Sequence, residues 1–222
     1  MIKALLLLLS LAMAATAGLG TEPRTGTVGG FFDVVDEEPY FVYGEDGRHY
    51  GYEDDFWDGC SVLCAVTDYA VGAEASSCLS ESRAAGNLIE PDRGSAWVEG
   101  AEGDGVGEYV DITRRYTVCD EAYGVDFRGF CVVNGVADTA EAWAEYNRVE
   151  KLNVYMNGSF VGMFLLKDTM LPQYFDLADC ALHADSAAET VFRFEIASVY
   201  PGGTGGDTAL TGIEMEFWTP NH

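Results

Sequence analysis

Glycines alternate with acidic residues through the middle of the chain, and this pattern constrains the fold more strongly than any other. The stretch concerned is residues 87–113, NLIEPDRGSAWVEGAEGDGVGEYVDIT. Glycine loses much backbone entropy in a helix or strand and offers no side chain to pack, so we expect an ordered loop here. Short strands at residues 96–98 and 108–112 are predicted to flank the loop, because apolar and aromatic residues alternate with polar ones there.

This loop allows two interpretations. Loops held between strands of a β-scaffold often carry recognition, in which case the acids would meet a partner. Alternatively, the glycines only form tight turns and the acids only face water. Trp97 stands at the head of the loop. We expect it to be a buried core anchor rather than an exposed binding platform, because large aromatic side chains bury most of their surface.

The charge of the chain excludes some classes of partner. Its 222 residues include 12 Lys and Arg against 37 Asp and Glu, which gives a net charge of −25. Nucleic acids are recognised through cationic contacts to phosphate, so no nucleic-acid partner is expected. Anionic membrane surfaces are disfavoured for the same reason.

The N-terminus has the pattern of an export signal. Lys3 precedes an apolar run from Ala4 to Ala14, and Ala15-Thr16-Ala17 supplies the small residues that a signal peptidase requires. We predict a signal peptide at residues 1–17; cleavage after Ala14 is the alternative. No later stretch is apolar enough to span a bilayer, so we expect no membrane insertion and a secreted or periplasmic location.

The six cysteines are expected to be oxidised after export. Six cysteines allow fifteen pairings, and sequence alone does not select among them. Our preferred pair is Cys119 with Cys131, since both lie on strands that we expect to be neighbours. Cys60–Cys64 and Cys78–Cys180 follow by elimination. A zinc site is disfavoured, because Cys60 and Cys64 lack a second close Cys or His pair.

Short strands separated by turn signals predict an all-β sandwich or barrel. Residues 18–59 are interpreted as an N-terminal extension, with short strands at 31–35 and 40–43, and residues 60–222 as the main domain. The only helix expected is at residues 138–146, with Asp138 or Thr139 as its N-cap. Asn157-Gly158 lies between two apolar runs, as in a hairpin with a type I′ turn.

Several motifs along the chain together resemble one known family. They are WVEGAEGDGVGEYVDI, VVNGVA, NRVEKLNVYMNG, LKDT and IASVYPGGTGGDTALTGIEM, within residues 61–218. The chain is similar to the NAD glycohydrolase translocation domain, a discoidin-like (coagulation-factor type C) module of the galactose-binding-domain superfamily. The resemblance implies an eight-stranded jelly-roll sandwich with loops at one end that meet sugars in carbohydrate-binding relatives. It implies no glycohydrolase activity, because that activity belongs to a separate domain of the toxin.

The chain departs from the family where some relatives bind calcium. The turn before Trp97 contains Glu90-Pro91, and Gly212 stands where calcium-dependent relatives have a glutamate. The resemblance therefore leaves a structural calcium ion, held by Asp92 and Ser95, as the less favoured of two interpretations. No other cofactor is expected.

These observations favour a secreted, non-catalytic binding module for a glycan or cell-surface partner. An enzyme is not expected, because no nucleophile–histidine pair, metal-ligand cluster or catalytic signature occurs. The alternative is a structural or protein-interaction domain without a small-molecule ligand.

A glycan site needs aromatic side chains beside hydrogen-bonding groups. Tyr109, Tyr146 and Tyr200 are candidate aromatic platforms. The predicted ligand-binding residues are Glu102, Asp104, Glu108, Tyr109, Asn147, Arg148 and Asp207. Two of them have structural alternatives: Glu108 would hydrogen-bond loop amides, and Arg148 would form an ion pair with Glu108 or Asp168.

Overall fold

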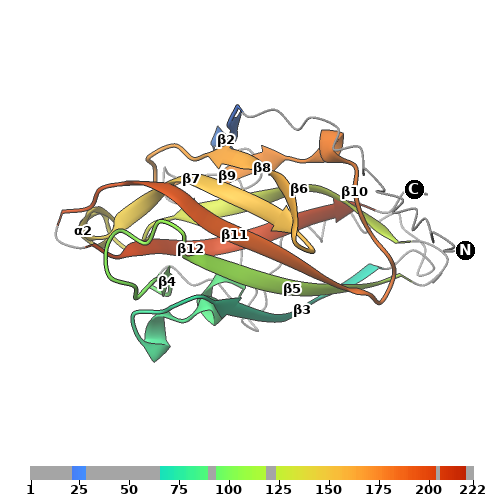
Figure 1. The fold of residues 1–222 in the computed structure, drawn as a ribbon, viewed down its shortest axis with the longest axis horizontal. Coiled ribbons are helices and arrows are strands. Elements are labelled where there is room, and N and C mark those ends of the chain that lie inside the picture. The colour runs from blue at the N-terminus through green and yellow to red at the C-terminus, as the bar shows by residue number, and fades with distance from the viewer. Residues whose placement is uncertain (1–21, 29–65, 90–93, 119–123, 204–205, 219–222) are drawn as a thin grey trace, which may run out of the picture.

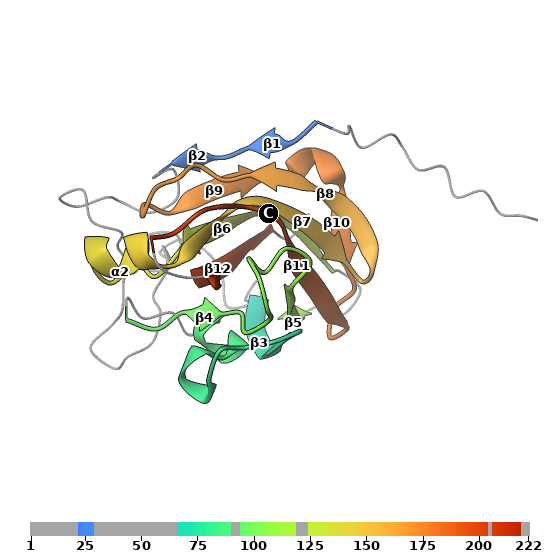
Figure 2. The same ribbon diagram turned by 60° about the vertical axis from the view of Figure 1, so that its left-hand side comes forward.

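Buried and exposed side chains alternate along the strands and divide the domain into two β-layers. The computed structural model describes residues 22–28, 66–89, 94–118, 124–203 and 206–218. Along β11 (Glu189–Tyr200), Phe192, Phe194 and Ile196 point into the core, whereas Arg193 and Glu195 point outward. The predicted all-β sandwich is confirmed (Figures 1 and 2).

The regular elements are short and almost all are strands. The strands are β1 (Arg24–Thr25), β2 (Thr27–Val28), β3 (Val66–Ala75), β4 (Trp97–Val98), β5 (Tyr109–Val118), β6 (Val125–Asn134), β7 (Asn147–Met156), β8 (Ser159–Leu165), β9 (Gln173–Asp176), β10 (Leu182–Ala184), β11 (Glu189–Tyr200) and β12 (Thr208–Trp218). The helical elements are the 3-10 turns η3 (Glu81–Arg83), η4 (Ala85–Leu88) and η5 (Ala178–Cys180), and the α-helix α2 (Ala140–Glu145).

Strand pairing joins the two layers at one corner. The order is β2-β9-β6-β12-β7-β11-β5-β3, while β8 pairs with β7, β10 with β6 and β4 with β12. β12 pairs with β6 in antiparallel orientation and begins beside β7 in parallel orientation, through Thr208 and Asn147. β9, β6 and β12 thus form one layer, and β8, β7, β11, β5 and β3 form the other.

Aromatic side chains fill the space between the layers. The rings of Phe127 in β6 and Phe192 in β11 are 4.6 Å apart, and those of Phe127 and Tyr116 are 5.2 Å apart. Both pairs meet edge to face, which is a favourable geometry for aromatic rings. Because β6 faces β5 and β11, the expectation that the strands of Cys119 and Cys131 are sheet neighbours is wrong.

Three local predictions are confirmed. Thr139 caps α2, since its Oγ1 accepts a hydrogen bond from the Ala142 amide at 3.1 Å. Asn157 and Gly158 connect β7 to β8 with φ of 48° and 78°, as a type I′ turn requires. The strand predicted at residues 108–112 exists, although it begins at Tyr109 and continues to Val118.

Residues 22–28 of the predicted extension are part of the sandwich. β1 pairs with β8 of one layer, and β2 pairs with β9 of the other. Gly26 joins them over the Phe175 ring, where an added Cβ would lie 2.7 Å from the ring. Only glycine fits there. Through its two strand pairings, the segment connects the two layers (Figure 2). The strands predicted at 31–35 and 40–43, and the signal peptide at 1–17, lie outside the described residues.

The disulfide predictions find no support in the described residues. Cys78, Cys131 and Cys180 carry free thiols. Cys78 follows β3 and Cys180 follows β9, and these strands lie near opposite ends of the strand order, so the predicted Cys78–Cys180 bond is not formed. Cys131 is buried in β6, and burial raises the pKa of its thiol well above the ordinary value. Cys60, Cys64 and Cys119 lie outside the described residues.

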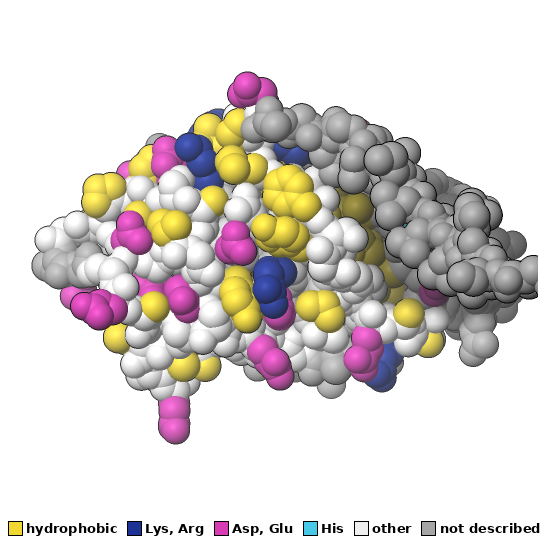
Figure 3. Space-filling model, viewed as in Figure 1, with side chains coloured by type: hydrophobic (Ala, Val, Ile, Leu, Met, Phe, Trp, Pro, Cys, Tyr) yellow, Lys and Arg dark blue, Asp and Glu magenta, His cyan; other side chains and the backbone are white. Residues whose placement is uncertain are grey.

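On the face shown in Figure 3, acidic side chains are scattered rather than collected in one patch. Among the described residues, the structure contains no helix with the length and apolar composition of a membrane span.

Candidate functional site

The glycine-rich stretch forms a loop at one end of the sandwich. We call residues 99–108, between β4 and β5, the crest loop; Figure 1 shows it at the same end as α2 and the chain between β11 and β12. Gly206 of that connection packs directly against the Gly103 carbonyl, and a methyl group at Gly206 would overlap it. Two loops far apart in sequence therefore support each other.

Glu99 holds the base of the crest loop from inside. Its side chain is fully buried, and its carboxylate accepts hydrogen bonds from the Ala101 amide at 2.8 Å and the Thr208 amide at 3.0 Å. Gly105 lies over this carboxylate with φ +74°, and an added Cβ would be 2.7 Å from Glu99 Cδ. Burial raises the pKa of Glu99, while the two amide donors oppose that effect. The carboxylate joins the loop to the start of β12.

Glu108 holds the other end of the loop. Its Oε2 accepts hydrogen bonds from the Ser76 hydroxyl at 2.6 Å and the Ser77 hydroxyl at 2.5 Å. The Ser77 hydroxyl also accepts a hydrogen bond from the Gly100 amide at 3.0 Å. We therefore assign Glu108 a structural role. The structural alternative predicted for Glu108 is correct in that its carboxylate accepts internal hydrogen bonds. The donors, however, are serine hydroxyls rather than loop amides.

At the top of the crest loop, between Glu99 and Glu108, several side chains remain exposed. Thr208 donates its hydroxyl to the Asp104 carbonyl at 2.7 Å, which fixes the backbone. The carboxylate of Asp104 accepts only a 3.2 Å hydrogen bond from Val106, and Glu102 makes no hydrogen bond or ion pair within the described ranges. Both acids and Val106 are exposed. The structure thus presents two carboxylates and one apolar side chain on a fixed backbone.

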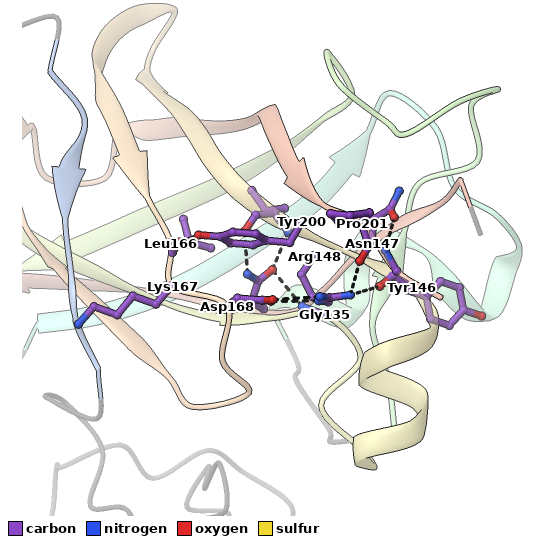
Figure 4. A network of polar contacts seen from close by, with 12 residues as sticks. Gly135, Tyr146, Asn147, Arg148, Leu166, Lys167, Asp168, Tyr200 and Pro201 are labelled. Carbon is purple, nitrogen blue, oxygen red and sulfur yellow. Dashed lines mark hydrogen bonds and ion pairs between the residues drawn. The ribbon is translucent and has the colours of Figure 1, made fainter. Parts of the chain in front are cut away.

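Arg148 and Asn147 support, from within, the end of the sandwich that carries the crest loop and residues 201–203 and 206–207, which we call the loop end (Figure 4). The Arg148 guanidinium donates to both Asp168 carboxylate oxygens at 3.1 Å, and to the backbone carbonyls of Tyr146 and Pro201, also at 3.1 Å. It also stacks on Trp143, 4.5 Å from the ring centroid. The predicted alternative of an ion pair with Asp168 is confirmed.

Asn147 bridges the connection between β11 and β12. Its side-chain amide donates to the Gly206 carbonyl at 2.8 Å and accepts from the Gly202 amide at 2.7 Å. Both Asn147 and Arg148 are buried, so neither side chain is available to a ligand in this conformation. Their prediction as ligand-binding residues is replaced by a structural role.

The three candidate tyrosines lie in different parts of the structure. The Tyr200 hydroxyl donates a hydrogen bond to the Leu166 carbonyl at 2.9 Å, and Tyr200 is part of the polar network around Arg148 (Figure 4). Tyr109 lies under Arg193, 3.6 Å from the guanidinium carbon, on the outer side of the sheet. Tyr146 remains at the loop end, half-buried, with its ring directed away from the Arg148 network in Figure 4.

Apart from Glu108, the predicted residues that lie in the two contacting loops are Glu102, Asp104 and Asp207. Asp207 follows Gly206, is half-buried, and accepts a hydrogen bond at its carbonyl from the Asn147 amide at 3.0 Å. Sequence reasoning did not select Glu99, Ser76, Ser77 or Val106. The available signals were weak: Glu99 directly follows a buried strand, and Val106 is the only large apolar residue within the crest loop.

The calcium interpretation stays a prediction. Asp92 lies outside the described residues, and Ser95 lies in the half-buried turn before β4. Within the described ranges, no three His, Cys, Asp or Glu side chains gather as metal ligands.

A family model described as "NAD glycohydrolase translocation F5/8 type C domain" matches residues 65–216. No curated protein matches the chain. One similar structure is the arabinofuranosyltransferase AftD from Mycobacteria, with 14% identity and a TM-score of 0.44, covering 80% of this chain and 13% of that one. Another is fragment 298–461 of a protein described as a chitobiase from Bacteroides thetaiotaomicron, with 14% identity and a TM-score of 0.43, covering 70% of this chain and 90% of that one.

Proposed function

The chain belongs to the NAD glycohydrolase translocation F5/8 type C domain family, and from this premise we propose that it is an exported recognition module whose crest loop binds a neutral cell-surface glycan. The family description names a translocation domain rather than a catalytic one, so no glycohydrolase activity is proposed. Binding is assigned to Glu102, Asp104 and Asp207, with Tyr146 as the aromatic neighbour.

The observation that carries this proposal is the contrast between anchored and exposed acids in one loop. The carboxylates of Glu99 and Glu108 accept hydrogen bonds from within the domain. Those of Glu102 and Asp104 are exposed on a backbone that is already held in place. Carboxylates accept hydrogen bonds from sugar hydroxyls, and a preorganised loop loses little entropy on binding. The net charge of −25 would repel an acidic polysaccharide, which favours a neutral glycan.

A glycan array probed with the mature, folded protein tests the proposal. We expect neutral glycans to bind, and the double change Glu102→Ala with Asp104→Ala to abolish that binding. The double change should alter the free energy of unfolding by no more than about 0.5 kcal/mol, as at ordinary surface sites. A denaturant melt of each variant separates loss of binding from loss of fold.

The matched control is Glu22→Ala with Asp185→Ala. It removes the same charge from two exposed acids outside the crest loop and its supporting segments. Binding that survives the crest change, or that is lost equally in the control, would contradict the proposed site. Silence across the array would instead favour a protein-interaction domain without a small-molecule ligand.

A further inference from the structure

The outer face of one layer carries more apolar side chains than a solvated sheet face needs. Side chains of β5, β11, β7 and β8 that point away from the core include Tyr109, Val191, Tyr155, Phe160 and Met163. We call these residues, with Arg193, the aromatic face. Antiparallel sheets normally turn polar residues to solvent. Figure 3 shows hydrophobic side chains gathered in the middle of this view, over the elements that Figure 1 labels β7, β8 and β11.

Phe160 is the clearest anomaly on the aromatic face. It is 43% exposed, and the only other exposed large hydrophobic residues in the described ranges are Leu79 and Val106. Its ring meets Tyr155 across the β7–β8 pair, with centroids 5.4 Å apart. An aromatic pair with one exposed ring on the outer face of the sheet costs solvation free energy that a bound partner would recover.

The charged groups of the aromatic face are held by local contacts. Arg193 donates to both carboxylate oxygens of Asp111 at 2.7 Å and stacks on Tyr109. Glu195 accepts a hydrogen bond from the Asn153 side chain at 2.9 Å. These groups are therefore held in place before any partner arrives, which lowers the entropic cost of binding.

The geometry favours a protein over a sugar on this face. A sugar stacks on an open, flat ring, but Arg193 covers one side of Tyr109, and the Tyr155 and Phe160 rings meet at 64°. Tyr, Phe, Met and Arg are the residue types enriched in protein–protein interfaces. A second copy of this chain is disfavoured, because each copy carries a charge of −25.

We propose that the aromatic face docks a protein partner whose contacting surface is apolar at its centre and basic at its rim. The apolar centre matches Tyr155, Phe160 and Met163. The basic rim matches the acidity of the chain and the exposed Glu74, which pairs in register with Asp111 at the edge of the face. Apart from Tyr109, which directly follows the crest loop, the residues of this surface lie away from that loop along the chain, and none of them is assigned to the proposed glycan site.

A random peptide library displayed on phage, panned on the full mature chain, tests the proposal. Enriched peptides are expected to combine aromatic or aliphatic residues with Lys or Arg. Phe160→Thr should weaken the affinity of the corresponding synthetic peptides by about tenfold or more, as the loss of an interface hot spot does. The exposed side chain of Phe160 allows this change without loss of the core, and a thermal melt verifies the fold.

Two controls make the result specific. Leu79→Thr removes an apolar side chain of similar exposure, 46%, outside this face and should leave peptide affinity unchanged. The double change at Glu102 and Asp104 should also leave it unchanged, which separates this proposal from the glycan site. Peptides without basic residues, peptides insensitive to Phe160→Thr, or no enrichment would overturn the proposal. So would a dimer in sedimentation that Phe160→Thr dissociates, or glycan binding lost in that variant.

Discussion

Replacing Trp97 with alanine is expected to lower the free energy of unfolding by about 3–5 kcal/mol, as truncation of a fully buried aromatic side chain usually does. Trp97 is fully buried in β4, and its indole donates a hydrogen bond to the Ser77 carbonyl at 2.9 Å. β4 has only two residues, paired with Leu210 and Ala209 of β12. The indole therefore anchors the start of the crest loop in the core.

A denaturant melt followed by far-UV circular dichroism measures this effect without depending on tryptophan fluorescence. The control is Leu79→Ala, which truncates an exposed apolar side chain and should change stability by no more than about 0.5 kcal/mol. A loss below about 1 kcal/mol for Trp97→Ala would show that the indole is not the anchor, because core truncations cost more than this.

The second large effect is expected for Asp168→Ala, which should cost about 3 kcal/mol of stability, as removal of one partner from a buried ion pair does. The Arg148 side chain is 9% exposed and would lose both carboxylate acceptors. Asp168 itself is 38% exposed, so water partly replaces it and the cost falls at the lower end of the range for buried pairs.

The ion pair between Arg115 and Glu189 provides the comparison for this change. Its two side chains are 44% and 51% exposed. Glu189→Ala should therefore cost less than about 1 kcal/mol, because solvent screens exposed pairs. Equal costs for Asp168→Ala and Glu189→Ala in parallel urea melts would contradict the assignment of Arg148 as the buried support of the loop end.

Sequence predicted best where the determining chemistry is local. Asn157-Gly158 forms its turn because those two residue types accept positive φ, and Thr139 caps α2 through an amide three residues away. The all-β class followed from many short strands, and the resemblance to the family was carried by motifs spread through residues 61–218.

Roles that depend on distant partners could not be predicted from the same patterns. Glu99, Glu102, Asp104 and Glu108 look equivalent in the sequence, yet two of them are anchors. What separates them is the position of Thr208 and of Ser76 and Ser77, which only the folded topology supplies. The expected neighbourhood of the strands before Cys119 and around Cys131 failed for a related reason, because β5 and β6 lie in facing layers rather than side by side.

Arg148 was recognised as an ion-pair candidate because cations are scarce in this chain, and Asp168 was one of two partners considered. Its burial was not predicted, because the helix expected at residues 138–146 places Arg148 just beyond a solvated helix end. In the structure, Asn147 and Arg148 instead begin β7, and both are buried. The participation of residues 24–28 in both layers was also missed, because strands of two residues leave almost no periodicity in a sequence.

The most direct test of the recognition role is a map of amide chemical-shift changes in the isotopically labelled mature protein, titrated with the neutral oligosaccharide that the array returns. The glycan proposal predicts saturable changes at residues 101–107 and 206–208 of the loop end, with none at Tyr155 or Phe160. Changes confined to the aromatic face, or no saturable change at the crest loop, would contradict it.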